Sequence, residues 1–143
     1  MNAILYIADD IQPLQSGKLL TVGLYPDRTI IAQIPKDDQA KLTRETPGSI
    51  GPLCVMMTIL DIDQGVYQAS VEVVQPDGSV MHKHEIPIMV SPGRRSVNLI
   101  LHFPLFQFIE AGTYMMRVTV DGKTIDGMFQ MVFQDPGINA SVH

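Results

Sequence analysis

The segment from residue 112 to residue 133 constrains the fold of this chain most. Apolar side chains recur at every second position through it, which is typical of a β-strand with one buried face. These side chains belong to Tyr114, Met116, Val118 and Val120, and Asp121-Gly122 follows directly. Asp-Gly suits a two-residue hairpin turn, because glycine takes positive φ freely and aspartate tolerates it. The segment therefore predicts a hairpin whose return strand covers about residues 123–133.

Further strands are predicted wherever apolar or alternating stretches are bounded by Gly, Pro or Asp. Asp9-Asp10 are expected to end the first of them, and Asp77-Gly78 to turn between two others. One short helix is expected near residues 37–45, because Asp37 or Asp38 could cap it. The further strands are residues 3–8, 18–24, 29–34, 53–60, 66–74, 79–86 and 97–103.

This series of short strands without β-α-β alternation predicts an all-β fold, a two-sheet antiparallel β-sandwich. A small closed β-barrel is the alternative, because strand count and spacing do not distinguish closure from stacking. With 143 residues, 45% of them hydrophobic, the chain can bury a core as one domain. We expect that domain over residues 1–135, and a flexible tail over residues 136–143, which show no periodicity.

Charge and apolar pattern indicate which partners to expect. The net charge is −5, and the ten Lys and Arg residues are scattered, so nucleic acid is not an expected partner. No stretch approaches the ~20 apolar residues of a membrane-spanning helix. The first residues lack the basic leader of a signal peptide, and we therefore expect a cytoplasmic protein without a membrane partner.

Two resemblances bear on the fold. Gly112-Thr-Tyr114 before an alternating strand resembles the corner of immunoglobulin-like sandwiches, in which a Tyr hydroxyl bonds to the backbone just upstream. That resemblance implies an immunoglobulin-like sandwich. Because Cys54 is the single cysteine and Trp is absent, the chain is not an antibody-type domain.

The second resemblance covers nearly the whole chain. Its elements are Ala8-Asp9-Asp10 after a first strand, the segment 17–25, and Glu110-Ala-Gly-Thr-Tyr114 with the Asp-Gly hairpin. Together they resemble an uncharacterised family of small bacterial and phage-encoded domains. The resemblance implies a β-sandwich and supplies no activity and no site residues.

His82-Lys83-His84-Glu85 is the clearest candidate for chemistry. On a strand His82 and His84 share a face, and two imidazoles so placed can bind zinc, iron or copper. A third ligand would have to come from elsewhere, and His102 is the candidate, since Glu85 points to the opposite face of a regular strand. The other interpretation is a polar pair on a partly exposed strand.

The remaining motifs have structural interpretations. Arg94-Arg95 could bind an anion, but a solvated turn fits Ser91-Pro-Gly better. Asp61-Ile-Asp63 is predicted to form a turn between two strands. Cys54 lies in an apolar strand with nothing adjacent to form a thiolate, and no Gly-x-Ser-x-Gly elbow occurs. We therefore predict that the chain is not an enzyme, with no catalytic, cofactor-binding or metal-binding residues.

The nine methionines indicate a different kind of function. Neighbouring strand residues point to opposite faces, so the pairs Met56-Met57 and Met115-Met116 each place one methionine outside a two-sheet core. With Ile100 and Val132, these side chains would be covered by residues 36–52 or by another chain. The alternative is scattered exposure at the surface, which is common in soluble proteins.

We expect a non-enzymatic domain that acts through protein–protein or self-association, as a symmetric homodimer. One alternative is a metal-binding domain that uses His82 and His84. The other is a small-molecule or glycan-binding module, which the absence of Trp and the presence of four Tyr disfavour.

Overall fold

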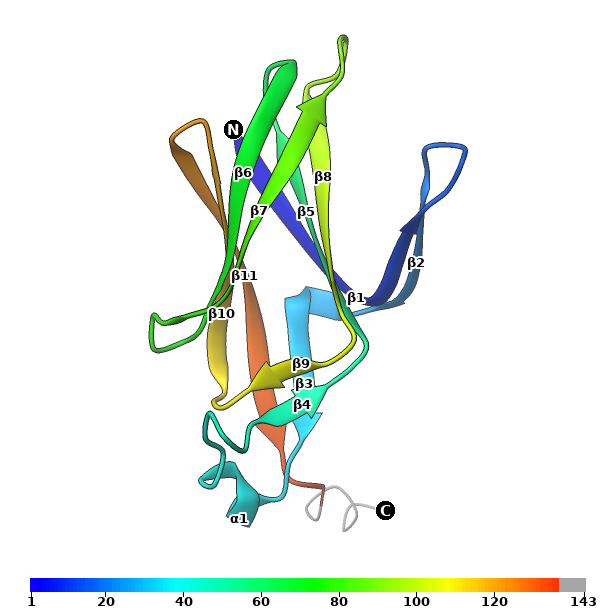
Figure 1. Ribbon diagram of the computed structural model, residues 1–143. Coiled ribbons are helices and arrows are strands. Elements are labelled where there is room, and N and C mark those ends of the chain that lie inside the picture. The colour runs from blue at the N-terminus through cyan, green and yellow to red at the C-terminus, as the bar shows by residue number, and fades with distance from the viewer. Residues whose placement is uncertain (137–143) are drawn as a thin grey trace.

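The computed structural model describes residues 1–136, and its architecture is a β-sandwich (Figure 1). The first sheet, sheet A, has the strand order β2-β1-β5-β8, and the second, sheet B, has the order β3-β11-β10-β6-β7. Sheet A comprises β1 (Asn2–Pro13), β2 (Leu19–Leu24), β5 (Leu53–Leu60) and β8 (Ser96–Phe103). Sheet B comprises β3 (Thr29–Gln33), β6 (Gly65–Val74), β7 (Val80–Val90), β10 (Gly112–Val120) and β11 (Lys123–Gln134).

The core lies between the two sheets and takes alternate side chains from each strand. In β5 the odd-numbered residues Val55, Met57 and Ile59 face inward. The aromatic rings of Phe106, Tyr114 and Phe129 pack together, with centroids 5.5 to 6.0 Å apart. The two-sheet, all-β prediction is therefore confirmed.

The Asp121-Gly122 turn forms as predicted. Val120 pairs with Lys123, and both turn residues have positive φ, 52° and 75°. These are the dihedrals of a tight hairpin whose twist matches that of its strands. The second Asp-Gly sequence, Asp77-Gly78, lies in a longer turn in which the Gln75 N–H donates to the Ser79 carbonyl.

Several element boundaries differ from the prediction. β1 does not end at Asp9-Asp10 but continues to Pro13, because β2 offers it a partner strand there. β7 continues through Pro87 to Val90, which is possible because β7 is an edge strand and its proline need not donate to a neighbour. Sheet B is mixed, since β3 pairs with β11 in parallel.

A small additional layer covers the lower end of the sandwich in Figure 1. It consists of β4 (Gly48–Ile50) paired with β9 (Phe106–Phe108), neither of which was predicted. The predicted helix is a single turn, α1 (Lys36–Gln39), and a 3-10 turn, η1 (Pro26–Arg28), precedes β3. Apart from Pro136, the predicted tail over residues 136–143 lies outside the described residues.

Candidate functional site

The β1–β2 hairpin projects from the body of the sandwich. Residues Asn2–Ala8 of β1 pair with β5, whereas Ala8–Pro13 pair with β2. Beyond Ala8 the strand therefore no longer pairs with β5, and residues 9–24 form an arm that continues sheet A only through β2. Figure 1 shows the resulting blue arm extending to the right of the two sheets.

The base of this arm covers part of the outer face of sheet A. Ile11 and Leu19 pack with Cys54, Met56 and Ala8 in a second apolar cluster, separate from the main core. Ile100 packs against the same cluster. Met56 is thus covered by the chain's own hairpin, and not by residues 36–52 as considered above, while Met57 lies in the main core.

The other predicted outward residues are less covered. Met115 is half-buried on the outer face of β10, whereas its neighbour Met116 is fully buried. Val132 stays exposed on the outer face of β11, beside Ile31 of β3. One methionine of each pair therefore lies outside the main core, as predicted.

An apolar groove lies between β2 and the neighbouring parts of β1 and β5. Its volume is about 330 Å³, and its walls come from β1, β2 and β5. No charged residue lines it; the lining side chains are Tyr6, Leu19, Thr21, Leu24, Met56 and Thr58. Such a groove suits apolar side chains of a partner better than a charged ligand.

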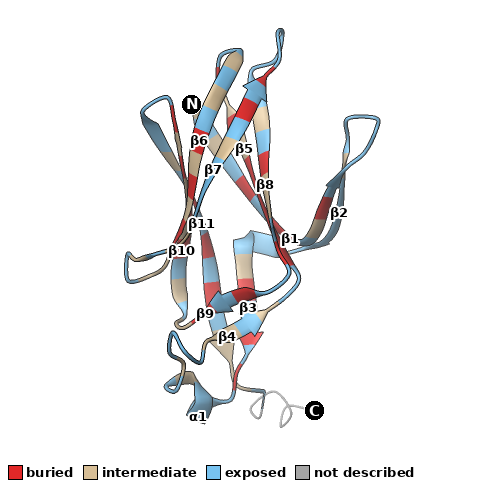
Figure 2. Cartoon of the chain, viewed as in Figure 1, coloured by how far each residue is buried: buried red, intermediate tan, exposed pale blue. Residues whose placement is uncertain are grey.

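The arm carries exposed apolar side chains, and Figure 2 shows most of β2 as exposed. Among residues 1–136, four of the 13 large apolar side chains that are exposed lie on the arm. Leu24 is 57% exposed and Val22 is 51% exposed. The four are Leu14, Leu20, Val22 and Leu24. Large exposed apolar patches are typical of interaction sites.

The free edge of β2 is unprotected. β2 ends sheet A, and its sequence Leu-Leu-Thr-Val-Gly-Leu contains no charge and no proline, with five of six residues exposed. Soluble proteins usually block such edges with charges, prolines or bulges. The edge strand β7 follows that rule, because it carries Lys83, Glu85 and Pro87.

Charges of opposite sign lie at the two ends of β2. Lys18 precedes the strand, and at the other end the Asp9 carboxylate occupies the space beside Gly23, where a Cβ would collide with it. Gly23 has a φ of 66°, so the strand bends there. Partial burial, together with the nearby charge of Asp9, raises the pKa of Tyr25.

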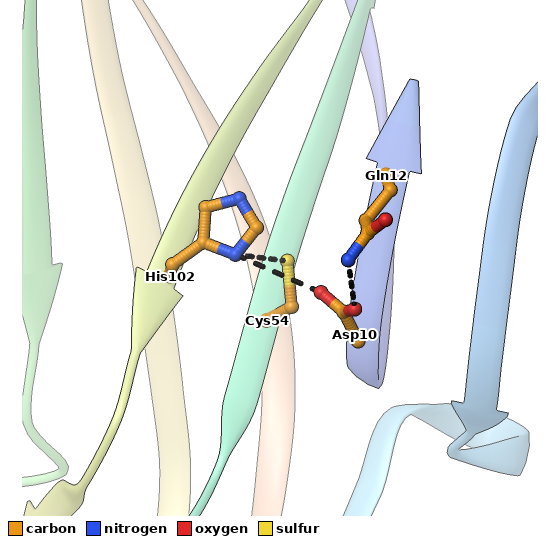
Figure 3. Close-up of polar contacts among 4 residues, drawn as sticks. All are labelled: Asp10, Gln12, Cys54 and His102. Atoms are coloured by element: carbon orange, nitrogen blue, oxygen red, sulfur yellow. Dashed lines mark hydrogen bonds and ion pairs between the residues drawn. The ribbon is translucent and has the colours of Figure 1, made fainter. Parts of the chain in front are cut away.

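A Cys-His-Asp cluster lies at the foot of the arm (Figure 3). The Cys54 Sγ is 3.6 Å from His102 Nδ1, and the same nitrogen is 4.0 Å from Asp10 Oδ1. The amide of Gln12 donates to the other Asp10 oxygen at 2.7 Å.

This cluster lacks the geometry of a nucleophilic triad. A triad uses one ring nitrogen for the nucleophile and the other for the carboxylate, whereas Cys54 and Asp10 both approach Nδ1 of His102. Cys54 is also completely buried, and burial is the main cause that raises the pKa of its thiol. Its thiolate is therefore disfavoured, and a buried structural role fits Cys54.

The structure brings His82 and His84 together but not His102. The rings of His82 and His84 lie 6.3 Å apart and nearly parallel. His82 contacts Phe103 on the core side of β8, whereas His102 pairs with Cys54 on the outer face of that strand. Among residues 1–136, no three His, Cys, Asp or Glu side chains are grouped so as to hold a metal ion.

His82 also lines a surface cavity. The cavity has a volume of about 260 Å³, and Arg44, Gln75 and Gln107 line it as well. Burial, and secondarily the charge of His84, lowers the pKa of His82, so this ring is neutral at pH 7.

The other two predicted turns are present. In the Ser91–Arg94 turn the Arg94 N–H donates to the Ser91 carbonyl, and Arg95 forms an exposed ion pair with Asp63 at 3.5 Å. The Asp61–Asp63 segment links β5 to β6, and Asp61 has a φ of 56°. Within the described part of the chain, no helix has the length and apolar character to cross a membrane.

The exposure of β2 could not be predicted directly from the sequence. A short apolar run between two turns predicts a buried strand as readily as an edge strand. The available indications were Gly23 within the run and the absence of any charge that would mark a solvated face. Neither one identifies Leu20, Val22 and Leu24 as surface residues.

Comparison with protein-family models shows a match over residues 3–132 to a family of unknown function, DUF6941. A search of curated proteins found no match.

Proposed function

The chain belongs to DUF6941, whose function is unknown, and we propose from its surface that it acts without catalysis, by binding another protein chain at its β1–β2 hairpin. The observation that carries this proposal is the uncharged edge of β2, with five of six residues exposed on an arm that leaves the sandwich.

A partner strand added at β2 would cover both the free backbone edge and the exposed apolar side chains of the arm. A partner strand supplies hydrogen bonds to the backbone groups on the free edge, while apolar side chains of both chains are buried. Burial of apolar surface contributes about 25 cal/mol per Å², and the exposed leucines and valine of β2 provide such surface.

The absence of catalysis is part of the proposal. The geometry around Cys54, with both neighbours at one nitrogen of His102, supports a structural thiol. We also propose that the domain is immunoglobulin-like, as the hydrogen bond from Tyr114 to Glu110 supports. A bacterial or phage origin and a cytoplasmic location are further proposals, which rest on the sequence alone.

A photo-crosslinking residue at Leu20 tests the proposed function. Expressed in the source cells, the protein is expected to form a crosslinked product of discrete mass. Val22→Lys should abolish that product, because it places a charge on the edge that must be desolvated. Val66→Lys is the matched control: Val66 is 78% exposed and lies on β6 of sheet B, not on the hairpin, so the product should persist.

Two results would contradict binding at the hairpin. One is the absence of any crosslinked product from position 20. The other is a product that forms equally well in the Val22→Lys and wild-type proteins.

Metal binding by His82 and His84 has less support from the geometry. The two rings are close, but His102 lies on the outer face of sheet A and cannot complete the set. Small-molecule binding in the cavity beside His82 is the other alternative, and the exposed Arg44 would be its charged group.

A further inference from the structure

We propose that the cavity beside His82 is a second binding site, independent of the hairpin, and that its ligand is a sugar acid, which carries one carboxylate and several hydroxyl groups. The cavity lies where the loop over residues 40–47, the start of β7 and the strand β9 meet (Figure 1). Its volume of about 260 Å³ is slightly below the roughly 300–1,000 Å³ of typical small-molecule sites, so it suits a single sugar unit. Met81, Phe108 and Ile109 supply apolar surface for the C–H groups of the ring.

A β-bulge shapes one wall of this cavity. Val73 pairs with His82 and Val74 pairs with Val80, so β7 contains one extra residue, Met81. Successive residues of a regular strand alternate between its two faces, whereas here Val80, Met81 and His82 all line the cavity. Bulges next to functional sites commonly re-aim side chains in this way. The bulge therefore brings an apolar side chain and an imidazole to the same site.

A hydrogen-bonded loop presents Arg44 to the cavity. The Thr46 N–H donates to Thr43 Oγ1 at 3.1 Å, and the two threonine hydroxyls are 2.8 Å apart. Arg44 forms no ion pair with another residue of the described range 1–136, and among the residues of that range that line the cavity it is the only one charged at pH 7. A guanidinium can hold a carboxylate by two parallel hydrogen bonds. Its single charge matches a carboxylate better than a phosphate, which carries up to two charges.

Asp77 lies near Arg44 but is engaged by Ser79. The Oδ1 atom of Asp77 accepts hydrogen bonds from the N–H and the hydroxyl of Ser79, at 2.8 and 2.6 Å. These bonds, and to a smaller extent the charge of Arg44, lower the pKa of Asp77. Because Asp77 does not line the cavity, the guanidinium of Arg44 remains available to a ligand carboxylate.

Three uncharged polar side chains complete the wall of the cavity, those of Gln75, Gln107 and His82. Each carboxamide offers donors and an acceptor, and the imidazole, neutral at pH 7, offers one of each. The carboxamide oxygen of Gln75 is buried and has no hydrogen-bond donor among the described residues. A hydroxyl group donates and accepts at once, so it suits such a wall. An ammonium group only donates, and no acidic side chain of residues 1–136 lines the cavity to balance its charge.

An NMR titration of the ¹⁵N-labelled full chain with sodium glucuronate and sodium galacturonate tests the site. With at least one of them, the amide signals of Arg44, residues 80–82 and residues 107–109 are expected to shift and to saturate, while those of residues 19–24 stay unchanged. Arg44→Gln should weaken binding by about tenfold or more, because it removes charge-assisted hydrogen bonds. Gln107→Leu removes neutral hydrogen bonds and should weaken binding by about two- to tenfold.

Arg94→Gln is the matched control for the loss of one positive charge. Arg94 is exposed on the Ser91–Arg94 turn and does not line the cavity, so its replacement should leave the affinity unchanged. Arg44 and Gln107 are exposed as well, so their variants are expected to fold, and the amide spectrum of each variant verifies this. Glucose, which lacks the carboxylate, should bind about tenfold more weakly than the better uronate.

Several results would overturn this inference. They are the absence of saturable shifts with both uronates, equal binding of glucose, and equal effects of Arg44→Gln and Arg94→Gln. Tighter binding of glucose 6-phosphate than of either uronate would replace the carboxylate by a phosphate and would overturn the ligand class. The Val22→Lys variant should bind the uronate as the wild type does, so failure at the cavity and failure at the hairpin are distinguishable.

Discussion

Tyr114 joins the core to the turn before β10. Its side chain is fully buried, and its hydroxyl donates to the Glu110 carbonyl at 2.7 Å. We expect Tyr114→Phe to lower the free energy of unfolding by about 1–3 kcal/mol, because it leaves a shielded carbonyl without its donor. Chemical denaturation measures this change.

Tyr67 offers a matched control within the same chain. Its hydroxyl also donates to the carbonyl four residues upstream, that of Asp63, but at an exposed position. Water can replace that bond, so Tyr67→Phe should cost less than about 1 kcal/mol. Equal losses in the two variants would contradict the role assigned to burial at Tyr114.

The stability contributed by Tyr114 is expected to depend on pH. Burial raises the pKa of Tyr114 from 10.0 to about 12. A raised tyrosine pKa stabilises the neutral folded form, so its contribution is complete below pH 10 and is lost as the pH rises through about 12. The stability difference between wild type and Tyr114→Phe should therefore shrink over this interval, and a constant difference would contradict it.

Cys54 is expected to react slowly in the folded protein. It is fully buried and its thiol pKa is raised, so the rate of alkylation by iodoacetamide should increase strongly only on unfolding. His102→Ala should leave the slow native rate unchanged or increase it by exposing the thiol. A decrease of tenfold in that variant would show that His102 activates Cys54, contrary to the geometry.

At the residue scale the sequence predicted interior positions better than surface ones. The alternation over β10 correctly identified Tyr114, Met116 and Val118 as core residues, because one face of β10 is buried in the core and the other is only partly covered. The pairing of Cys54 with His102 joins residues 48 positions apart, and it depends on strand order, which periodicity does not encode.

The β1–β2 hairpin is the element with the least support from the sandwich. Beyond Ala8, β1 pairs only with β2, and the residues from Ala8 to Leu24 contribute to the small cluster around Cys54 and not to the main core. Elements with few buried contacts open at low free energy. In the Val22→Lys variant, amides of residues 19–24 should therefore exchange hydrogen much faster than those of residues 112–120.

Hydrogen exchange in the wild-type protein provides the comparison. If β2 pairs with a second chain, exchange over residues 19–24 should slow as protein concentration rises, while exchange in β10 should not change. Mass spectrometry of peptic peptides resolves the two regions. Protection of β2 equal to that of β10 in the Val22→Lys variant would contradict the weak attachment of the arm.

At the element scale most strands could be predicted, and the exceptions share a cause. Asp9-Asp10 lie within β1 and Pro87 lies within β7, although both are ordinary strand-ending residues. Each lies on an arm or an edge, where one side of the strand faces water and tolerates a charge or a missing donor. The short strands β4 and β9 have too few residues to show a period.

For the whole molecule, composition and periodicity predicted the layered architecture because they determine how much apolar surface must be buried. They also predicted that some apolar residues would lie outside the core. They could not predict which segment covers them, because a hairpin that folds back on its own sheet and a second chain bury the same side chains. Which apolar side chains of β2 stay exposed can be determined only from the three-dimensional structure.

One structural feature also determines how force would pass through the molecule. β1 is continuous from the main sheet into the arm, and its first half is joined to β5 by seven consecutive residue pairs, Asn2–Leu60 to Ala8–Cys54. Tension applied to the arm along β1 would load the hydrogen bonds of all seven residue pairs in shear at the same time, so that they would have to break together and not one after another. A force on the arm would therefore be transmitted through β1 to β5 and resisted by all seven residue pairs together.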